Sequence, residues 1–95
     1  MKNKAQAHLI CYDIGEPKRL LKIHRFLKKQ AIPVQYSVFY AKLTKAQRST
    51  LINALGTRIN EVEDDIRIYP LPKNIEYTQL GKTIWPNANF FSDEE

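Results

Sequence analysis

Residues 7–14 constrain the fold more than any other part of this chain, because apolar side chains fall on both faces of their extended backbone. A strand that is apolar on both faces lies inside a sheet and is covered on at least one side. The chain has 95 residues, which at roughly 100–200 residues per domain is enough for one domain. We therefore expect a central strand whose neighbours come from the same domain.

Residues 17–30 follow this strand with the periodicity of an amphipathic helix. Pro17 suits the first position of a helix, where no backbone N–H is needed. The polar side of the helix is strongly basic. Such a ridge is either an ordinary solvated face or a surface for a polyanion, and the pattern leaves both interpretations open. Its cations are Lys18, Lys22, Arg25 and Lys29.

Residues 34–43 are rich in β-forming residues, but their apolar alternation changes phase part-way. One strand cannot keep both sets of side chains on one face, so we predict two short strands joined by a bulge or a reversal near residues 38–40. Thr44 and Gln47 form a capping box, which predicts a second helix from there to about residue 60.

The remaining β-forming segments are residues 66–71 and 78–85. Pro70 cannot donate a hydrogen bond within a sheet, which indicates that this residue lies in an edge strand or at the end of a strand. The resulting order predicts an α+β fold of the ferredoxin-like βαββαβ type, with an extra C-terminal strand and both helices on one face of an antiparallel sheet. We assign residues 1–85 to this domain and residues 86–95 to a tail. A second copy of the chain is expected to cover the other face, as a symmetric homodimer.

Charge is distributed unevenly along the chain. Residues 1–48 hold 11 basic and 2 acidic residues, whereas residues 49–95 hold 4 basic and 8 acidic residues. The basic half indicates a nucleic-acid partner. The single cysteine excludes an internal disulfide and a cysteine-based zinc site. Because the sequence has neither a secretory signal nor an apolar stretch of membrane-spanning length, we expect a cytoplasmic protein with no membrane partner.

Asp13 is the main candidate for chemistry, because a carboxylate that ends a strand is a suitable ligand for Mg²⁺. A two-fold axis would bring two such aspartates together. The alternative is a structural role, in which Asp13 bonds the following loop or caps the helix. Arg19 either contacts a phosphate or pairs with Glu16 or Asp13. Ser37 and Phe39 are supporting candidates, although satisfying a neighbouring strand and packing in the core are the simpler roles.

Several short segments, taken in order, carry a family resemblance. They are YDI at residues 12–14 followed by KR at 18–19, VQYSVF at 34–39, LT at 43–44, and DDIRIYPL at 64–71. Together they resemble the CRISPR-associated protein 2 family over about residues 8–72. Many members carry a second acidic residue shortly after the first aspartate, whereas this chain has Glu16 beside a proline there.

The resemblance implies a ferredoxin-like homodimer that lies between subunits of the CRISPR integrase, CRISPR-associated protein 1. It implies binding of double-stranded DNA for spacer acquisition. It also implies a metal-dependent endonuclease acting on RNA or double-stranded DNA. Asp13 would then be the catalytic metal ligand, in one Mg²⁺ or Mn²⁺ site shared by the dimer. The alternatives are a small toxin-like ribonuclease of similar fold and a ligand-binding regulator, which is less favoured because the sequence has no pocket motif.

Overall fold

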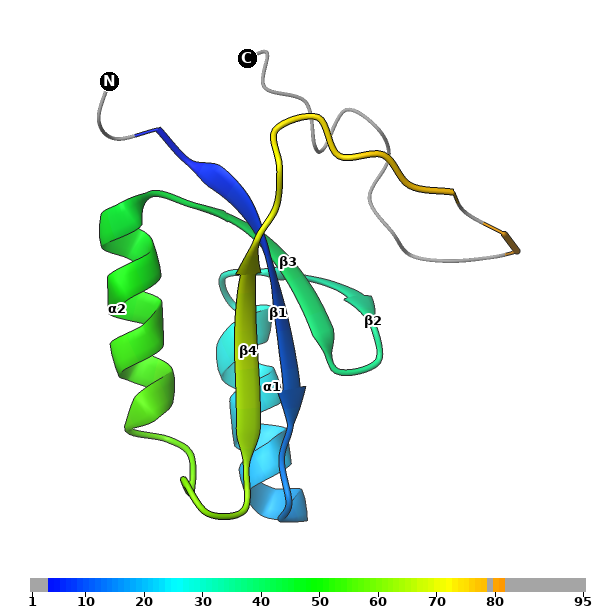
Figure 1. Ribbon diagram of the computed structural model, residues 1–95. Helices are drawn as coiled ribbons and strands as arrows, with labels where there is room; N and C mark the ends of the chain where they lie inside the picture. Colours follow the sequence, from blue (N-terminus) through cyan, green and yellow to red (C-terminus); the bar gives the residue numbers. More distant parts are fainter. Residues whose placement is uncertain (1–3, 79, 82–95) are drawn as a thin grey trace.

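The computed structural model describes residues 4–78 and 80–81 and shows a four-stranded antiparallel sheet (Figure 1). Strand β1 (Gln6–Asp13) lies between β3 (Val38–Leu43) and β4 (Asp65–Pro70). Strand β2 (Ile32–Gln35) pairs with β3 and completes the order β2-β3-β1-β4. The central position of the first strand and the α+β, ferredoxin-like plan are thereby confirmed, and Pro70 lies at the end of an edge strand, in agreement with both positions considered for it.

Helix α1 (Pro17–Lys28) begins with the side chain of Glu16, whose carboxylate accepts a hydrogen bond from the Arg19 backbone N–H at 2.8 Å. This cap satisfies one of the N–H groups that a helix start leaves without a partner. The helix ends two residues before the predicted end. Pro33 explains the difference, because a residue that precedes proline is driven toward extended backbone and β2 starts at that residue.

Helix α2 (Lys45–Gly56) opens with the predicted capping box. The Thr44 hydroxyl accepts a hydrogen bond from the Gln47 backbone N–H at 3.1 Å, and the Gln47 side-chain oxygen accepts one from the Thr44 N–H at 2.8 Å. The helix ends at its glycine, four residues before the predicted limit near residue 60. Glycine disfavours helix by about 1 kcal/mol relative to alanine, and here no packing offsets that loss.

The β-rich segment forms two short strands, as predicted, but the reversal lies earlier than expected. It occurs at Tyr36 and Ser37, before β3 starts, and not within residues 38–40. Ser37 has a φ of 63°, which lets a loop of two residues turn the chain back. A register irregularity between Pro33 and Gln35 accounts for the rest of the phase change.

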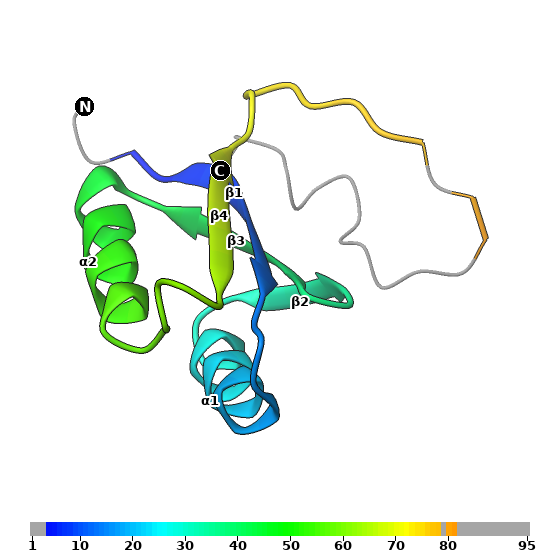
Figure 2. The same cartoon turned by 60° about the horizontal axis from the view of Figure 1, so that its bottom comes forward.

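Both helices pack on the same face of the sheet (Figure 2). Side chains from α1 and α2 meet alternate residues of β1 and β3 in one buried cluster, as the period of two along a strand requires. The predicted placement of the helices is therefore confirmed. The buried residues of this cluster are Ile10, Tyr12, Ile14, Ile23, Leu27, Phe39, Ala41, Leu43, Leu51 and Leu55.

The opposite face, called the open face below, carries a smaller apolar cluster to which neither helix contributes. The chain that leaves β4 partly covers it, and the Leu71 N–H bonds the Ala7 carbonyl at 2.9 Å. Half-buried apolar side chains remain on it, and Tyr69 of β4 is 46% exposed. The cluster consists of Val34, Tyr40 and Leu71, with Ala7, Leu9, Val38 and Ile75 packed against it.

The C-terminal strand predicted over residues 78–85 falls mostly outside the described residues. Of that range, residues 78, 80 and 81 are described, and none of them is in a strand. Within the described part of the chain, neither helix is long and apolar enough to cross a membrane.

Candidate carboxylate site and nucleic-acid interface

Asp13 is the last residue of β1 and its side chain is exposed. Its neighbour Tyr12 points into the helix-covered core, so Asp13 points to the open face. Its register partner in β4 is Asp65. Residues directly opposite each other in antiparallel strands have Cβ atoms about 5 Å apart. The two carboxylates are therefore neighbours at this end of the open face.

The structural roles considered for Asp13 belong to other carboxylates. Glu16 caps α1, and Asp64 accepts the hydrogen bond from the Gly15 N–H at 2.8 Å. In the described part of the chain no hydrogen bond or ion pair involves the Asp13 side chain. The carboxylate therefore has its full capacity to bind a cation or a solvent molecule.

The donor set at this end of the sheet is compatible with a hard divalent cation. Mg²⁺ is commonly held by one or two protein carboxylates and keeps several water ligands, which matches the Asp13 and Asp65 pair. The Asp65 carboxylate also accepts a hydrogen bond from Arg67 Nε at 3.1 Å. Among the described residues of the chain, no group of three or more histidine, cysteine or acidic side chains is arranged to hold a metal.

Arg19 does not join the basic ridge, because carboxylates surround its guanidinium. It bonds both oxygens of Asp64, at 2.6 and 2.9 Å, and Glu63 at 3.0 Å. Glu16 lies 3.9 Å away. Of the alternatives left open by the sequence, pairing with Glu16 is therefore present and pairing with Asp13 is absent.

Asp64 is the centre of this network, which we call the clamp. Its side chain has 0% exposure and also accepts hydrogen bonds from the backbone N–H groups of Gly15 and Asn60, both at 2.8 Å. The hydrogen bonds from Arg19 hold the pKa of Asp64 well below its usual range, and those from the two backbone groups add to this. The same pairing raises the pKa of Arg19. The clamp ties the loop before α1 to the loop before β4, which fixes the ends of both strands that carry the exposed carboxylates.

Four of the predicted cations remain on the outer side of α1 and are exposed. We call them the α1 ridge. None of them forms an ion pair within the described residues, and they recur at helical spacing along one stripe of the surface. They are Lys18, Lys22, Arg25 and Lys29.

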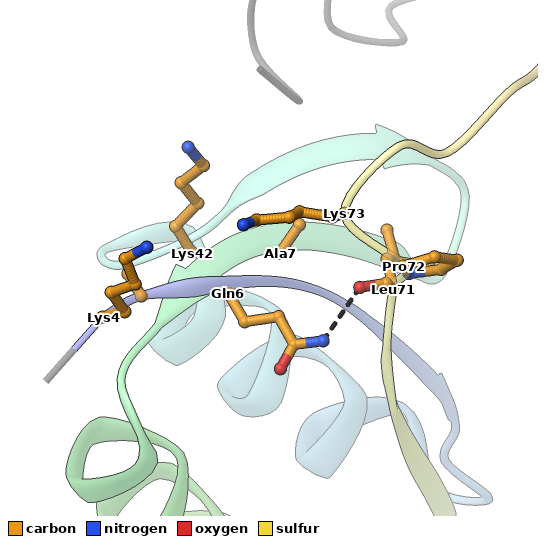
Figure 3. Close-up of a pocket in the computed structure, with 8 residues that line it drawn as sticks. Lys4, Gln6, Ala7, Lys42, Leu71, Pro72 and Lys73 are labelled. Carbon is orange, nitrogen blue, oxygen red and sulfur yellow. Dashed lines mark hydrogen bonds between the residues drawn. The ribbon is translucent and has the colours of Figure 1, made fainter. Parts of the chain in front are cut away.

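A second group of cations lies at the other end of β1. Figure 3 shows the amino groups of Lys4, Lys42 and Lys73 around a pocket of about 300 Å³. Gln6 forms part of its wall and donates a hydrogen bond to the Leu71 carbonyl at 2.9 Å. Sequence reasoning did not single out this group, because its members come from three separate segments that only the sheet brings together.

The supporting candidates occupy different positions. Phe39 is 1% exposed and belongs to the core, with its ring 6.0 Å from that of Tyr12 and 5.3 Å from that of His24. Ser37 lies in the β2–β3 turn, where its carbonyl accepts a hydrogen bond from the Tyr12 N–H at 3.1 Å. Phe39 therefore has the packing role considered for it, and Ser37 satisfies the neighbouring strand through its backbone.

Comparison with known proteins places this arrangement in a family. The sequence model of the CRISPR associated protein Cas2 family matches residues 6–78, a range that includes every helix and strand of the described residues. This chain belongs to that family. Its similarity to the CRISPR-associated endoribonuclease Cas2 1 of Nitrosomonas europaea is 40% identity over 84% of this chain and 76% of the relative.

Two further Cas2 proteins agree in sequence and in structure. The CRISPR-associated endoribonuclease Cas2 2 of Thermodesulfovibrio yellowstonii is 40% identical over 78% of this chain and 81% of its own length. The crystal structure of Streptococcus pyogenes Cas2 at pH 6.5 superposes with a TM-score of 0.66 and 29% identity, covering 77% of this chain and 99% of that one. The resemblance found in the sequence is thereby confirmed.

In this Cas2 family chain, sequence reasoning missed the roles of the two carboxylates at the start of β4. Asp64 and Asp65 were recognised only as members of a family motif. Asp64 lies just before β4 and its carboxylate is buried in the clamp, whereas Asp65 is the first residue of β4 and is exposed opposite Asp13. The alternation of side chains along residues 65–69 was visible in the sequence. It could not place Asp65 opposite Asp13 without the register between β1 and β4.

Proposed function

We propose that this chain is a subunit of CRISPR spacer acquisition. It forms a homodimer that binds duplex DNA and bridges subunits of the integrase, CRISPR-associated protein 1. The observation that carries the proposal is the two-sided layout of the molecule. Both helices and the α1 ridge occupy one side of the sheet, and the open face, which carries the smaller apolar cluster and no helix, occupies the other.

The open face supports the dimer. A chain of 95 residues buries only about 60–65% of its unfolded surface, so covering a further apolar face adds substantially to its stability. A two-fold axis would place the same face of a second copy against it and would leave both α1 ridges outside.

The α1 ridge supports duplex binding. Its cations lie on α1 and its C-cap, and they have no ion-pair partner among the described residues. Contacts of this kind position a protein on the phosphate backbone without sequence preference. Such binding suits a subunit that must hold DNA fragments of any sequence.

We further propose metal-dependent cleavage of phosphodiester bonds at Asp13, in accordance with the endoribonuclease names of the relatives. Asp13 would hold Mg²⁺ or Mn²⁺, with Asp65 opposite it as the second carboxylate. When bound, the ion supplies an activated water and stabilises charge on the scissile phosphate. Both carboxylates point to the open face, so a two-fold axis nearby would form one site shared by the dimer. The clamp contributes by fixing the ends of β1 and β4.

The toxin-like ribonuclease is the weaker alternative. Its only support was a similar fold, whereas the family match covers residues 6–78 and points to CRISPR function.

One experiment tests both parts of the proposal. Wild type, Asp13→Asn and the control Glu61→Gln are purified identically and mixed with a labelled duplex or RNA, with the integrase, and with Mg²⁺ or EDTA. We expect all three to form the complex of dimer, duplex and integrase. Only wild type and the control should cleave, and only in these two should Mg²⁺ raise the melting temperature.

Each part of the proposal has its own negative outcome. Equal cleavage by wild type and Asp13→Asn would remove the metal site from Asp13. Failure of every variant to form the complex would remove the scaffold function.

A further inference from the structure

A cavity of about 310 Å³ lies between α1 and the β2–β3 turn, on the helix side of the sheet. The proposed dimer would leave it accessible, because the open face is on the opposite side. Its walls include Leu20 and Leu21 of α1, and the turn contributes Tyr36 and Ser37. Neither the α1 ridge nor the carboxylate pair accounts for this cavity.

The cavity is lined by apolar side chains and by residues that carry polar groups. Leu21 is 50% exposed, although it is a large apolar residue on a helix surface. Tyr12 and His24 also line the cavity, and the Tyr12 hydroxyl and His24 Nδ1 form a part-buried hydrogen bond with each other at 3.0 Å. A ligand there would meet aromatic and aliphatic surface together with groups that can donate and accept hydrogen bonds. A flat heteroaromatic ring has this chemistry.

Tyr36 is an exposed aromatic ring held on a rigid turn. It lines the cavity and is 87% exposed. The next residue, Ser37, has a positive φ, which is uncommon for a residue other than glycine. The hydrogen bond from the Tyr12 N–H to the Ser37 carbonyl fixes the turn to β1. The backbone that carries the ring is therefore already in place before a ligand binds, which lowers the ordering cost of binding.

Cations border the same cavity. Lys18 and Arg25 lie three residues before and four residues after Leu21, so they are its neighbours on the helix surface. Neither has an ion-pair partner among the described residues. An apolar protein side chain would use the cavity but not these cations, whereas a nucleotide would use both.

We propose that this cavity takes one unstacked base of a single-stranded nucleic acid, with Tyr36 as the stacking surface and Lys18 and Arg25 on the neighbouring phosphates. The inference rests on the nuclease function proposed above and names its substrate class. A duplex keeps its bases stacked, so it can engage the α1 ridge but cannot fill the cavity. In single-stranded nucleic acid the bases can unstack from each other, and proteins bind such bases by stacking them on aromatic side chains.

The test measures binding in EDTA, so that it is independent of cleavage. The probe is a five-nucleotide strand with 2-aminopurine in the centre and abasic residues elsewhere. The reference is the fully abasic strand, which has the same phosphates. We expect wild type to bind the probe about tenfold or more tightly than the reference and to quench its fluorescence. Tyr36→Phe should retain both effects, and Tyr36→Ala should lose both.

Val62→Ala is the matched control, because Val62 is 93% exposed and lies outside the cavity. It should behave as wild type. Equal affinity of wild type for the two strands would overturn the proposal, as would wild-type behaviour of Tyr36→Ala. Asp13→Asn should bind the probe normally in EDTA, so failure of base binding and failure of cleavage are separate results.

Discussion

The α1 ridge gives the most quantitative prediction, which concerns the salt dependence of duplex binding. Replacing Lys18, Lys22, Arg25 and Lys29 by glutamine should remove most of it. From the first to the last of these residues the helix rises about 16 Å. Duplex DNA carries one charge per roughly 1.7 Å of its axis, so about ten phosphate charges lie along that length. Every cation of the ridge therefore has a phosphate within reach.

The magnitude follows from the number of contacts. Four cations on each of two protomers make eight contacts at most, and each adds about 0.9 to the slope of log affinity against log salt. The expected slope is about −7 for a dimer that uses the whole ridge. Affinity should then fall by about 10⁴-fold between 50 and 200 mM salt.

Fluorescence anisotropy with a labelled duplex at several salt concentrations measures the slope directly. The matched control replaces Lys4, Lys42, Lys45 and Lys73 by glutamine, which removes the same charge and neutralises the other cationic group. We expect this control to keep a steep slope and the ridge variant to become nearly flat. If the ridge variant keeps the wild-type slope, or if the control loses it, the ridge is only a solvated face and the reasoning is refuted.

Two further predictions concern the clamp and the open face. Asp64→Asn should be less stable than wild type above about pH 4, the pKa of an unfolded aspartate. Because the pKa of Asp64 is lowered in the folded protein, this difference in stability should shrink as the pH falls from about 4 toward the lowered pKa. A stability difference that does not change with pH in acid melts would contradict the clamp. Leu9→Asp should convert the proposed dimer to the 11.1 kDa chain in sedimentation, since it places a charge on the apolar open face. The control Leu21→Asp, on the exposed side of α1, should remain dimeric, and equal masses for the two variants would argue against an open-face dimer.

The amino-acid sequence by itself determined the parts of this protein that depend on short-range interactions. The capping box at Thr44 and the stripe of cations on α1 each involve residues within a few turns of one helix, so their spacing is visible in the chain. The phase change in residues 34–43 likewise predicted two strands. It did not locate the turn at Tyr36 and Ser37, because the bulge and the loop each absorb part of the phase change.

Only the tertiary structure decided what the carboxylates do. Asp13 and Asp65 are far apart in sequence and meet because β1 and β4 pair in one particular register. A shift by one residue would turn Asp65 away from the open face and from Asp13. Arg19 was predicted either to contact phosphate or to pair with a carboxylate, and the deciding partner is 45 residues away in the chain. Register and long-range pairing depend on how the whole sheet packs against its helices, so no local pattern in the sequence encodes them.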